Sequence, residues 1–342
     1  MKKKKQIVFI EDYSTIMIYK IAILFKKQGY ETILIRLLEP DKANLEFYNQ
    51  AYDKVINFNI DVNIKSKNLF SILHLSLKNI RNIVLGIISS LKLKPYIIFG
   101  RATPNRGIAF FRILFRKYPL IYFPYDIHAN YYPNSKMARK ISRYSRLEIW
   151  AERFCFENSD AVMHKGGEDA LKHLNGRMIG DDIKLPPLQI NFRPYCSKDF
   201  IVPFNKNKLS KKDNELHLVH LGSSGVAKKD MYNSMLYEAK EIINQKMHFH
   251  IYTQSNIKME ENKIRKEFIK ENKNTPNFKY FHIHDSLNPR EIVKEISKYD
   301  FGIWQPFEPK EFPDYNLELH FAVGHKFASY MEAGIPFFCS PK

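Results

Sequence analysis

The sequence predicts an α/β protein built from two domains, each with a parallel sheet covered by helices. Short apolar runs alternate with longer stretches of helical period, an order typical of strands joined by helical crossovers. A segment rich in Pro, Asn and Lys interrupts this alternation once, over residues 185–215, and the alternation then begins again. At 342 residues the chain is also long for a single core.

Five strands are predicted before the interruption. Each is a short apolar run bounded by turn residues or charges, and they fall at residues 6–10, 32–36, 96–100, 120–124 and 160–164. Residues 15–30 join the first two and end near Gly29, which fits a helix closed by glycine. Residues 135–160 predict a second long helix, whose apolar stripe includes Leu147, Ala151 and Phe154.

The same pattern is repeated after the interruption. Strands are predicted at residues 216–222, 249–254, 278–285 and 301–306, and helices at residues 231–245 and 288–300. The segment GHKFASYMEAGIPFFCS, residues 324–340, adds a helix that stops at Gly334 and an apolar strand. We therefore predict an N-terminal domain over residues 1–195, a linker over residues 196–214 and a C-terminal domain over residues 215–342.

A basic surface of one sign is predicted in the first half of the chain. The formal net charge is +18, and no Asp or Glu occurs from Val62 to Tyr125, whereas eleven Lys and Arg residues fall there. Residues 66–92 place apolar clusters and basic residues at helical spacing, which is typical of a helix on an anionic membrane. A core helix with a basic solvent face is compatible with the same pattern. Because the stretch is aliphatic rather than aromatic, we expect no nucleic-acid partner.

The cysteines and the apolar runs indicate a compartment. Cys155, Cys196 and Cys339 lie far apart without CxxC or Cys/His spacing, so neither a disulfide framework nor a zinc site is expected. No run reaches the ~18 apolar residues of a membrane span, and the first apolar run is too short for a signal peptide. We expect a cytoplasmic protein, peripheral at the inner face of the membrane.

Two features of the C-terminal domain suit a negatively charged ligand. The loop GSSGVAKKD, residues 222–230, follows a predicted strand, and its glycines let the backbone approach a ligand beside Lys228 and Lys229. In the last helix, the unpaired amides of the first turn and the charge of Lys326 favour a phosphate. Two such features in one domain predict a diphosphate site.

These segments resemble the glycosyltransferases with the GT-B fold, especially the retaining family four and its bacterial relatives. Residues 326–340 resemble the K-x-x-E-Y-x-x-x-G-x-P segment of that family, and residues 286–306 resemble the helix and strand before it. The resemblance implies two Rossmann-like domains facing each other across a cleft, the C-terminal one holding a nucleotide-diphosphate sugar and the N-terminal one the acceptor. It implies a hexosyltransferase-like, metal-independent enzyme without a cofactor, in agreement with the absence of a DxD sequence.

The resemblance also implies the site residues. The catalytic candidates are Asp126 and His128, of which His128 is favoured as general base because an imidazole titrates near neutrality. The nucleotide-sugar-binding candidates all lie in the C-terminal domain: Gly222, Ser223, Lys228, Lys229, His284, Ser286, His325, Lys326, Ser329 and Glu332.

The chain also departs from the family pattern. Ser329 and Phe321 stand where the family has glutamates, and Glu332 comes three positions late. Because the chain ends at Lys342, directly after a predicted strand, we expect a truncated C-terminal part. The expected function is sugar transfer to a glycan or lipid-linked acceptor in cell-surface polysaccharide synthesis. The alternatives are a nucleotide-sugar epimerase of the same fold and an inactive sugar-nucleotide-binding or scaffolding relative.

Overall fold

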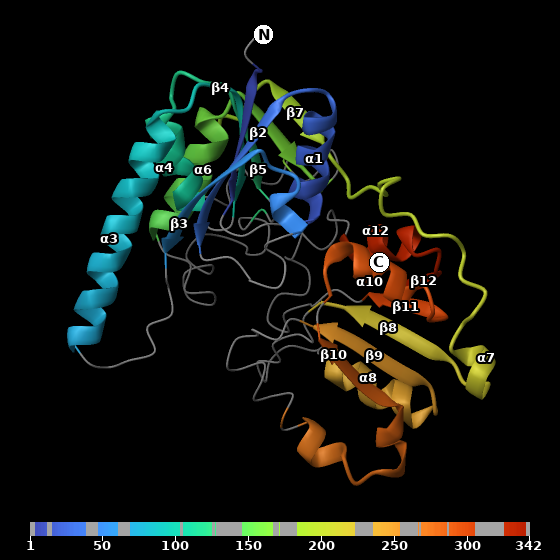
Figure 1. Cartoon of the computed structure of the whole chain (residues 1–342). Helices are drawn as coiled ribbons and strands as arrows, with labels where there is room; N and C mark the ends of the chain where they lie inside the picture. The colour runs from blue at the N-terminus through green and yellow to red at the C-terminus, as the bar shows by residue number, and fades with distance from the viewer. Residues whose placement is uncertain are drawn as a thin grey trace. The chain divides into compact units, whose positions relative to one another are not determined.

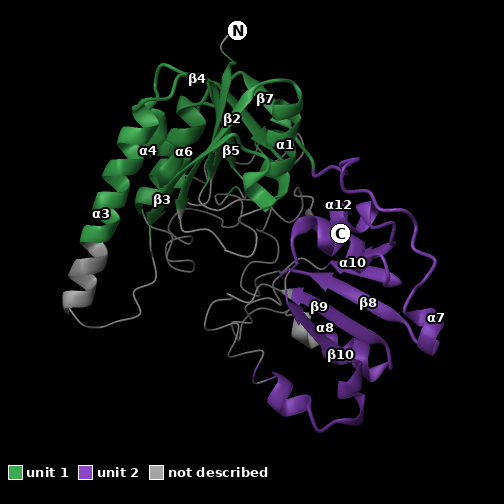
Figure 2. Cartoon of the chain, in the orientation of Figure 1, with its two compact units in different colours: residues 1–193 green, residues 194–342 purple. Residues whose placement is uncertain are grey.

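A computed structural model gives the fold of the chain. It describes residues 4–11, 16–38, 47–60, 69–102, 105–124, 127, 146–166, 171, 183–222, 235–253, 266, 268–285, 287–304 and 325–339. The chain divides into two compact units, residues 1–193 and residues 194–342 (Figure 2). Each unit contains its own sheet, and all the strand pairs of both sheets are parallel (Figure 1).

The first unit is a seven-stranded sheet with the strand order β3-β2-β1-β4-β5-β6-β7. Its strands are β1 (Gln6–Glu11), β2 (Glu31–Leu38), β3 (Lys54–Ile60), β4 (Pro95–Ala102), β5 (Leu120–Pro124), β6 (Ala161–His164) and β7 (Leu188–Asn191). Its longer helices are α1 (Ile16–Lys27), α3 (Leu69–Leu91), α4 (Asn105–Leu114) and α6 (Arg146–Asn158). Figure 1 shows α1 on one side of the sheet and the other three helices on the opposite side.

All five strands predicted for this unit are present, and the two edge strands, β3 and β7, were not predicted. An edge strand buries few side chains, so its apolar signal is weak. In β3 only Ile56 and Phe58 are buried, and the side chains of β7 are exposed or half-buried. β7 also lies inside the Pro-rich segment that suggested a connection without structure.

Helix α6 buries only part of the stripe that its sequence predicts. Leu147 is 54% exposed, whereas Glu148 and Glu152 are buried beside Ala151. A carboxylate oxygen of Glu148 accepts a hydrogen bond from the backbone N–H of Asn105, the first residue of α4. Glu148 thus accepts from a first-turn amide that has no acceptor within its own helix, which accounts for a buried carboxylate on α6.

Helix α3 packs on β3 but leaves much of its apolar surface uncovered. Gly86 and Ser90 are buried, and a Cβ at Gly86 would lie 2.6 Å from the ring of Phe58, so the small residues mark the packed side. Among the described side chains of the helix, residues 77–91, six large apolar ones are exposed: Leu77, Ile80, Val84, Leu85, Ile88 and Leu91. Among the helices that the structure describes, α3 included, none has the length and apolar character to cross a bilayer.

The second unit is a five-stranded sheet with the strand order β10-β9-β8-β11-β12. Its strands are β8 (His217–Leu221), β9 (His248–Thr253), β10 (Phe281–Asp285), β11 (Phe301–Trp304) and β12 (Phe337–Cys339). Its helices include α7 (Ser210–Asp213), α8 (Met235–Asn244), α10 (Pro289–Ile296) and α12 (His325–Glu332). β10 begins three residues later than predicted because Pro276–Tyr280 form a 3₁₀ helix with Pro at its start.

The segment predicted as a linker, residues 196–214, lies against the second unit. The backbone N–H of Val202 donates to the carbonyl oxygen of Glu332 at 3.0 Å. The ammonium group of Lys208 donates to the carbonyl oxygens of Ser297 and Tyr299, both at 2.8 Å. These hydrogen bonds place the segment on α10 and α12 rather than free between the units.

Candidate functional site

The strand order of the second unit marks one position for a ligand. β8 pairs with β9 on one side and with β11 on the other, so the order of the chain reverses there. In open parallel sheets, ligands bind beyond the carboxyl ends of the strands at such a switch point. β8 ends at Leu221, which places Gly222 at the predicted position.

Gly222 and Lys326 meet at this switch point. Gly222 has φ +99°, and its backbone N–H donates to the carbonyl oxygen of Tyr252 at 2.8 Å. A Cβ at Gly222 would lie 3.2 Å from Cε and 3.4 Å from Nζ of Lys326. A side chain here would be strained and would crowd Lys326, so glycine suits both the turn and the close approach. The structure thus brings together two of the predicted binding residues.

His220 fixes the position of the Lys326 ammonium group. Nδ1 of the fully buried His220 lies 3.2 Å from the carbonyl oxygen of Ile303, so this nitrogen carries the hydrogen. Its Nε2 is then an acceptor, and it lies 3.1 Å from Nζ of Lys326. Burial of the amino group lowers the pKa of Lys326 to about 7. Lys326 is therefore close to half-protonated at neutral pH, and a nearby anion would favour its charged form.

Tyr330 and Gly302 hold α12 against the sheet. The hydroxyl group of Tyr330 lies 2.9 Å from the carbonyl oxygen of Ile303, to which it donates, and 3.3 Å from the backbone N of Leu221, from which it accepts. A Cβ at Gly302 would lie only 2.7 Å from the Tyr330 ring. Burial also raises the pKa of Tyr330, so its hydroxyl stays protonated. These contacts place the first turn of α12, with Lys326, at the end of β8.

Three further predicted binding residues are described. Glu332 is buried, and its Oε1 accepts a hydrogen bond of 2.7 Å from the backbone N–H of Ser197, which ties the linker segment to α12. Ser329 is half-buried, about one turn after Lys326. His284 hydrogen-bonds through Nε2 to His250 at 2.9 Å. Their binding of a nucleotide sugar stays a prediction.

The other predicted site residues lie outside the described part of the chain. These are Asp126, His128, Ser223, Lys228, Lys229 and Ser286, and His325 is described only as the first residue of α12. Sequence reasoning also missed two residues of the site, His220 and Tyr330. His220 lies two residues before Gly222, and Tyr330 lies four residues, about one turn, after Lys326. This spacing was the one signal in the sequence, and it does not reveal that His220 and Tyr330 both contact the carbonyl oxygen of Ile303.

Comparisons with known proteins identify the fold. No family model and no curated protein sequence matches the chain. Among solved structures, sucrose-phosphate synthase of Thermosynechococcus elongatus is 8% identical, with a TM-score of 0.63 over 98% of this chain and 81% of that chain. HepE of Anabaena in complex with UDP is 11% identical, with a TM-score of 0.58 over 98% and 80%. A glycosyltransferase of Rickettsia africae is 14% identical, with a TM-score of 0.55 over 98% and 79%.

At these identities the likeness concerns the fold alone. It nevertheless extends over nearly the whole chain in all three cases. The parallel sheets of seven and five strands agree with it. The chain therefore has the GT-B fold, with two Rossmann-like domains, as the sequence predicts.

Proposed function

We propose that the protein is a glycosyltransferase that takes a sugar from a nucleoside-diphosphate sugar. The observation that carries this proposal is the pairing of Lys326 with Gly222 at the switch point of the second sheet. Both residues suit a diphosphate, because Gly222 leaves the backbone accessible and Lys326 brings an amino group that an anion would protonate. HepE, a solved structure of the same fold, is in complex with UDP, which supports a nucleotide as the ligand.

The arrangement suits the departure of a diphosphate. As the bond between the anomeric carbon and the phosphate oxygen breaks, the electron pair stays on that oxygen, and negative charge grows on the diphosphate. The Lys326 ammonium group and the first-turn amides of α12 stabilise this charge in place, without a metal ion or a cofactor. His220 acts as a positioning residue, because it accepts a hydrogen bond from Lys326 and is itself held by Ile303.

The acceptor side of the reaction is proposed from the family resemblance. His128 acts as general base or orients the acceptor hydroxyl group, Asp126 faces the sugar, and the resemblance to family four favours retention over inversion. Ser223, Lys228, Lys229, Ser286 and His325 complete the donor site. Calorimetry with a panel of nucleoside-diphosphate sugars, followed by incubation with and without acceptors, tests this assignment. Conversion of a donor without an acceptor would instead indicate an epimerase, and binding without any turnover would indicate an inactive relative.

A proton is expected to enter the site together with the donor. In the free protein the pKa of Lys326 is about 7, so the side chain is mostly neutral at pH 8, and a diphosphate raises this pKa. Binding should therefore take up close to one proton at pH 8 and few at pH 6, and the affinity should rise by up to about tenfold per unit as the pH falls from 9 towards 7. Calorimetry in buffers of different ionisation enthalpy measures this uptake. Donor binding at pH 8 without proton uptake would contradict the assigned role of Lys326.

The acceptor is proposed to be a glycan or lipid-linked sugar at the inner face of a membrane, in cell-surface polysaccharide synthesis. The exposed apolar surface of α3 supports this, since its side chains recur at helical spacing; Leu77 and Ile80 are 59% and 57% exposed. The basic residues around it are also exposed: Lys78, Arg81, Lys92 and Lys94. An apolar surface bordered by positive charge suits an anionic lipid surface better than a neutral partner.

Reversing two charges on α3 should release the protein from anionic vesicles. For the double variant Lys78→Glu/Arg81→Glu we expect at least a roughly 30-fold weaker partition, since each basic residue lost near such a surface costs about 1 kcal/mol and each new carboxylate is repelled by the lipids. Sedimentation with vesicles containing phosphatidylserine measures the partition. Lys270→Glu/Lys273→Glu, which reverses two exposed charges of the second unit, is the matched control and should bind as the wild type does. If the wild type binds neutral vesicles as strongly as anionic ones, or if both double variants lose binding equally, then α3 is not the surface that binds the membrane.

A further inference from the structure

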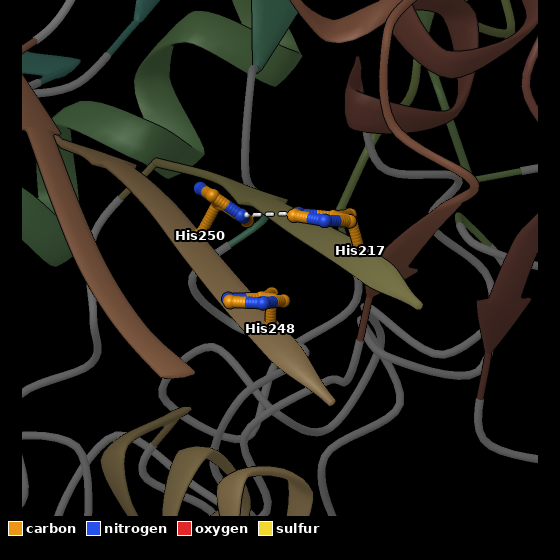
Figure 3. Close-up of side chains that lie close together, drawn as sticks. All are labelled: His217, His248 and His250. Carbon is orange, nitrogen blue, oxygen red and sulfur yellow. Dashed lines mark hydrogen bonds between the residues drawn. The ribbon is translucent and has the colours of Figure 1, made fainter. Parts of the chain in front are cut away.

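Five histidines lie on one face of the second sheet. They come from β8, β9 and β10: His217, His248, His250, His282 and His284. The parallel register places His217 opposite His248 and His250 opposite His282, so the side chains of these pairs point the same way. Figure 3 shows His217 and His250 joined by a hydrogen bond, with His248 beside them. These five residues are called the histidine cluster below.

The cluster is connected by two rows of hydrogen bonds that end at carboxylates. In the first row, His217 Nε2 lies 3.0 Å from Asp213 Oδ2, and His217 Nδ1 lies 3.0 Å from His250 Nε2. This row continues from His250 Nδ1 to His284 Nε2 at 2.9 Å.

The second row begins at the other carboxylate. His248 Nε2 lies 2.7 Å from Glu215 Oε2, and His248 Nδ1 lies 2.8 Å from His282 Nε2. Because the carboxylates can only accept, Nε2 of His217 and of His248 carries the hydrogen in this arrangement.

The Nε2 atoms of His217 and His248 both lie next to carboxylate oxygens. Asp213 Oδ2 lies 3.0 Å from His217 Nε2 and 3.9 Å from His248 Nε2, and Glu215 Oε2 lies 2.7 Å from the latter. In a tetrahedral zinc site with bonds of about 2.0–2.1 Å, neighbouring ligand atoms are about 3.3 Å apart. The observed separations lie on both sides of that value. Asp213, Glu215 and His248 thus each offer a ligand atom within 4.8 Å of the other two, and His217 Nε2 adjoins this group at Asp213.

We propose that His217, His248, Asp213 and Glu215 bind one zinc ion or a similar divalent transition-metal ion. Two imidazoles with two carboxylates are the ligands of such ions, whereas magnesium and calcium prefer oxygen ligands alone. The two carboxylates balance the double positive charge, so the site is neutral when filled. Asp213 and Glu215 have side chains that are 40% and 35% exposed, which gives the ion a path from solvent.

The neighbouring histidines supply the outer contacts that such a site requires. A metal-bound imidazole usually donates its other N–H to an acceptor, which fixes its orientation. When a metal replaces the hydrogen on Nε2, the hydrogen of each ring moves to Nδ1. His217 then donates to His250, and His248 donates to His282, across the same short distances. Each ring of the cluster keeps one proton, so only the direction of the hydrogen bonds changes.

One ring has to turn when the ion binds. The rings of His217 and His248 are stacked, with centroids 4.3 Å apart and an angle of 6° between their planes. A metal ion lies in the plane of each imidazole that binds it, so the two planes must be tilted towards one point. Rotation of a His ring about its Cβ–Cγ bond is a soft torsion, which makes this adjustment easy.

The site lies at the amino ends of the strands, away from Gly222 at the carboxyl end of β8. It joins α7, whose last residue is Asp213, to β8 and β9. The bound ion therefore stabilises the second unit and takes no part in donor chemistry. The inference is independent of the proposed glycosyl transfer, and its test needs no nucleotide.

Zinc titration of the tag-free, EDTA-treated full chain tests the proposal. We expect one equivalent to bind and, at about 100 times the dissociation constant, a rise in melting temperature on the order of 5 °C, with no rise from magnesium. Cobalt should give the visible absorption of a tetrahedral ion. His217→Gln and Asp213→Asn should each weaken binding at least about tenfold. Asp285→Asn, another exposed carboxylate at the end of β10, is the matched control and should bind normally.

Two results would overturn the assignment. The first is the absence of saturable one-equivalent binding, or an equal response to magnesium. The second is normal zinc binding by His217→Gln and Asp213→Asn, which would place the ion elsewhere. If His217→Gln does not fold, Asp213→Asn decides, because Asp213 is an exposed residue of α7.

Discussion

Replacing Lys326 with methionine is expected to weaken the binding of a nucleoside-diphosphate sugar by about 10–100-fold, because a charge-assisted hydrogen bond to the diphosphate is lost. Turnover should fall further, by about 100–1000-fold, since the same group stabilises charge that grows only as the sugar leaves. Calorimetry and a donor-consumption assay measure the two effects. If the variant keeps the wild-type donor affinity and turnover rate, Lys326 does not belong to the donor site.

The stability of the same variant separates a binding role from a structural one. Lys326 is half-buried, and burial lowers the pKa of its amino group to about 7, so a methionine of similar length removes part of that desolvation cost. Its removal also deprives His220 of a hydrogen-bond donor. Because the two effects oppose each other, the free energy of unfolding should stay within about 1 kcal/mol of the wild-type value. Lys294→Met, at an exposed position of α10, is the matched control and should leave binding and stability unchanged.

Gly302→Ala is expected to lower the free energy of unfolding of the second unit by about 1–3 kcal/mol, the usual effect of forcing a methyl group into a filled core. The new Cβ would lie 2.7 Å from the Tyr330 ring, and Tyr330 is held by Ile303 and Leu221, so the ring cannot simply turn away. Helix α12 has to move outwards, and Lys326 moves with it. Donor affinity should therefore fall in parallel, even below the melting temperature.

Gly86→Ala in the first unit provides the comparison. There a Cβ would lie 2.6 Å from the Phe58 ring, so this substitution also forces a methyl group against an aromatic ring. We expect a similar loss of stability but unchanged donor affinity at low temperature, because Gly86 belongs to α3 and not to the donor site. Equal losses of affinity in both variants would show that general destabilisation, not the placement of α12, governs binding. Urea unfolding and calorimetry give the two quantities for each protein.

Much of this architecture could be predicted from the sequence because the spacing of apolar residues is a local property of the chain. The alternation of apolar runs and helical stretches predicts the buried strands of both units, such as Gln6–Glu11 and Leu120–Pro124. The small-residue loop at Gly222 and the Lys just inside the last helix predict an anion site in the second unit. Edge strands such as β3 were missed, since a strand that buries one face or less carries a weak signal.

Other features depended on which segments the fold brings together. The burial of Glu148 goes with its hydrogen bond to the first amide of α4, forty-three residues away in the chain. The exposed face of α3 follows from the position of β3, because helical period shows an apolar stripe but not whether a partner covers it. The histidine cluster escaped notice for the same reason. Its members are spread from His217 to His284, and only the pairing of β8, β9 and β10 puts them on one face.

The sequence by itself thus determined the fold class, the buried strands and the residue types available for a diphosphate. Only the tertiary structure decided three contacts of the site. Lys326 lies against Gly222, His220 hydrogen-bonds the amino group of Lys326, and Tyr330 holds α12 against the sheet. The physical reason is that period and composition act within a few residues, whereas these contacts join residues from 27 to 106 positions apart. Strand order, a property of the whole sheet, selects which distant residues meet.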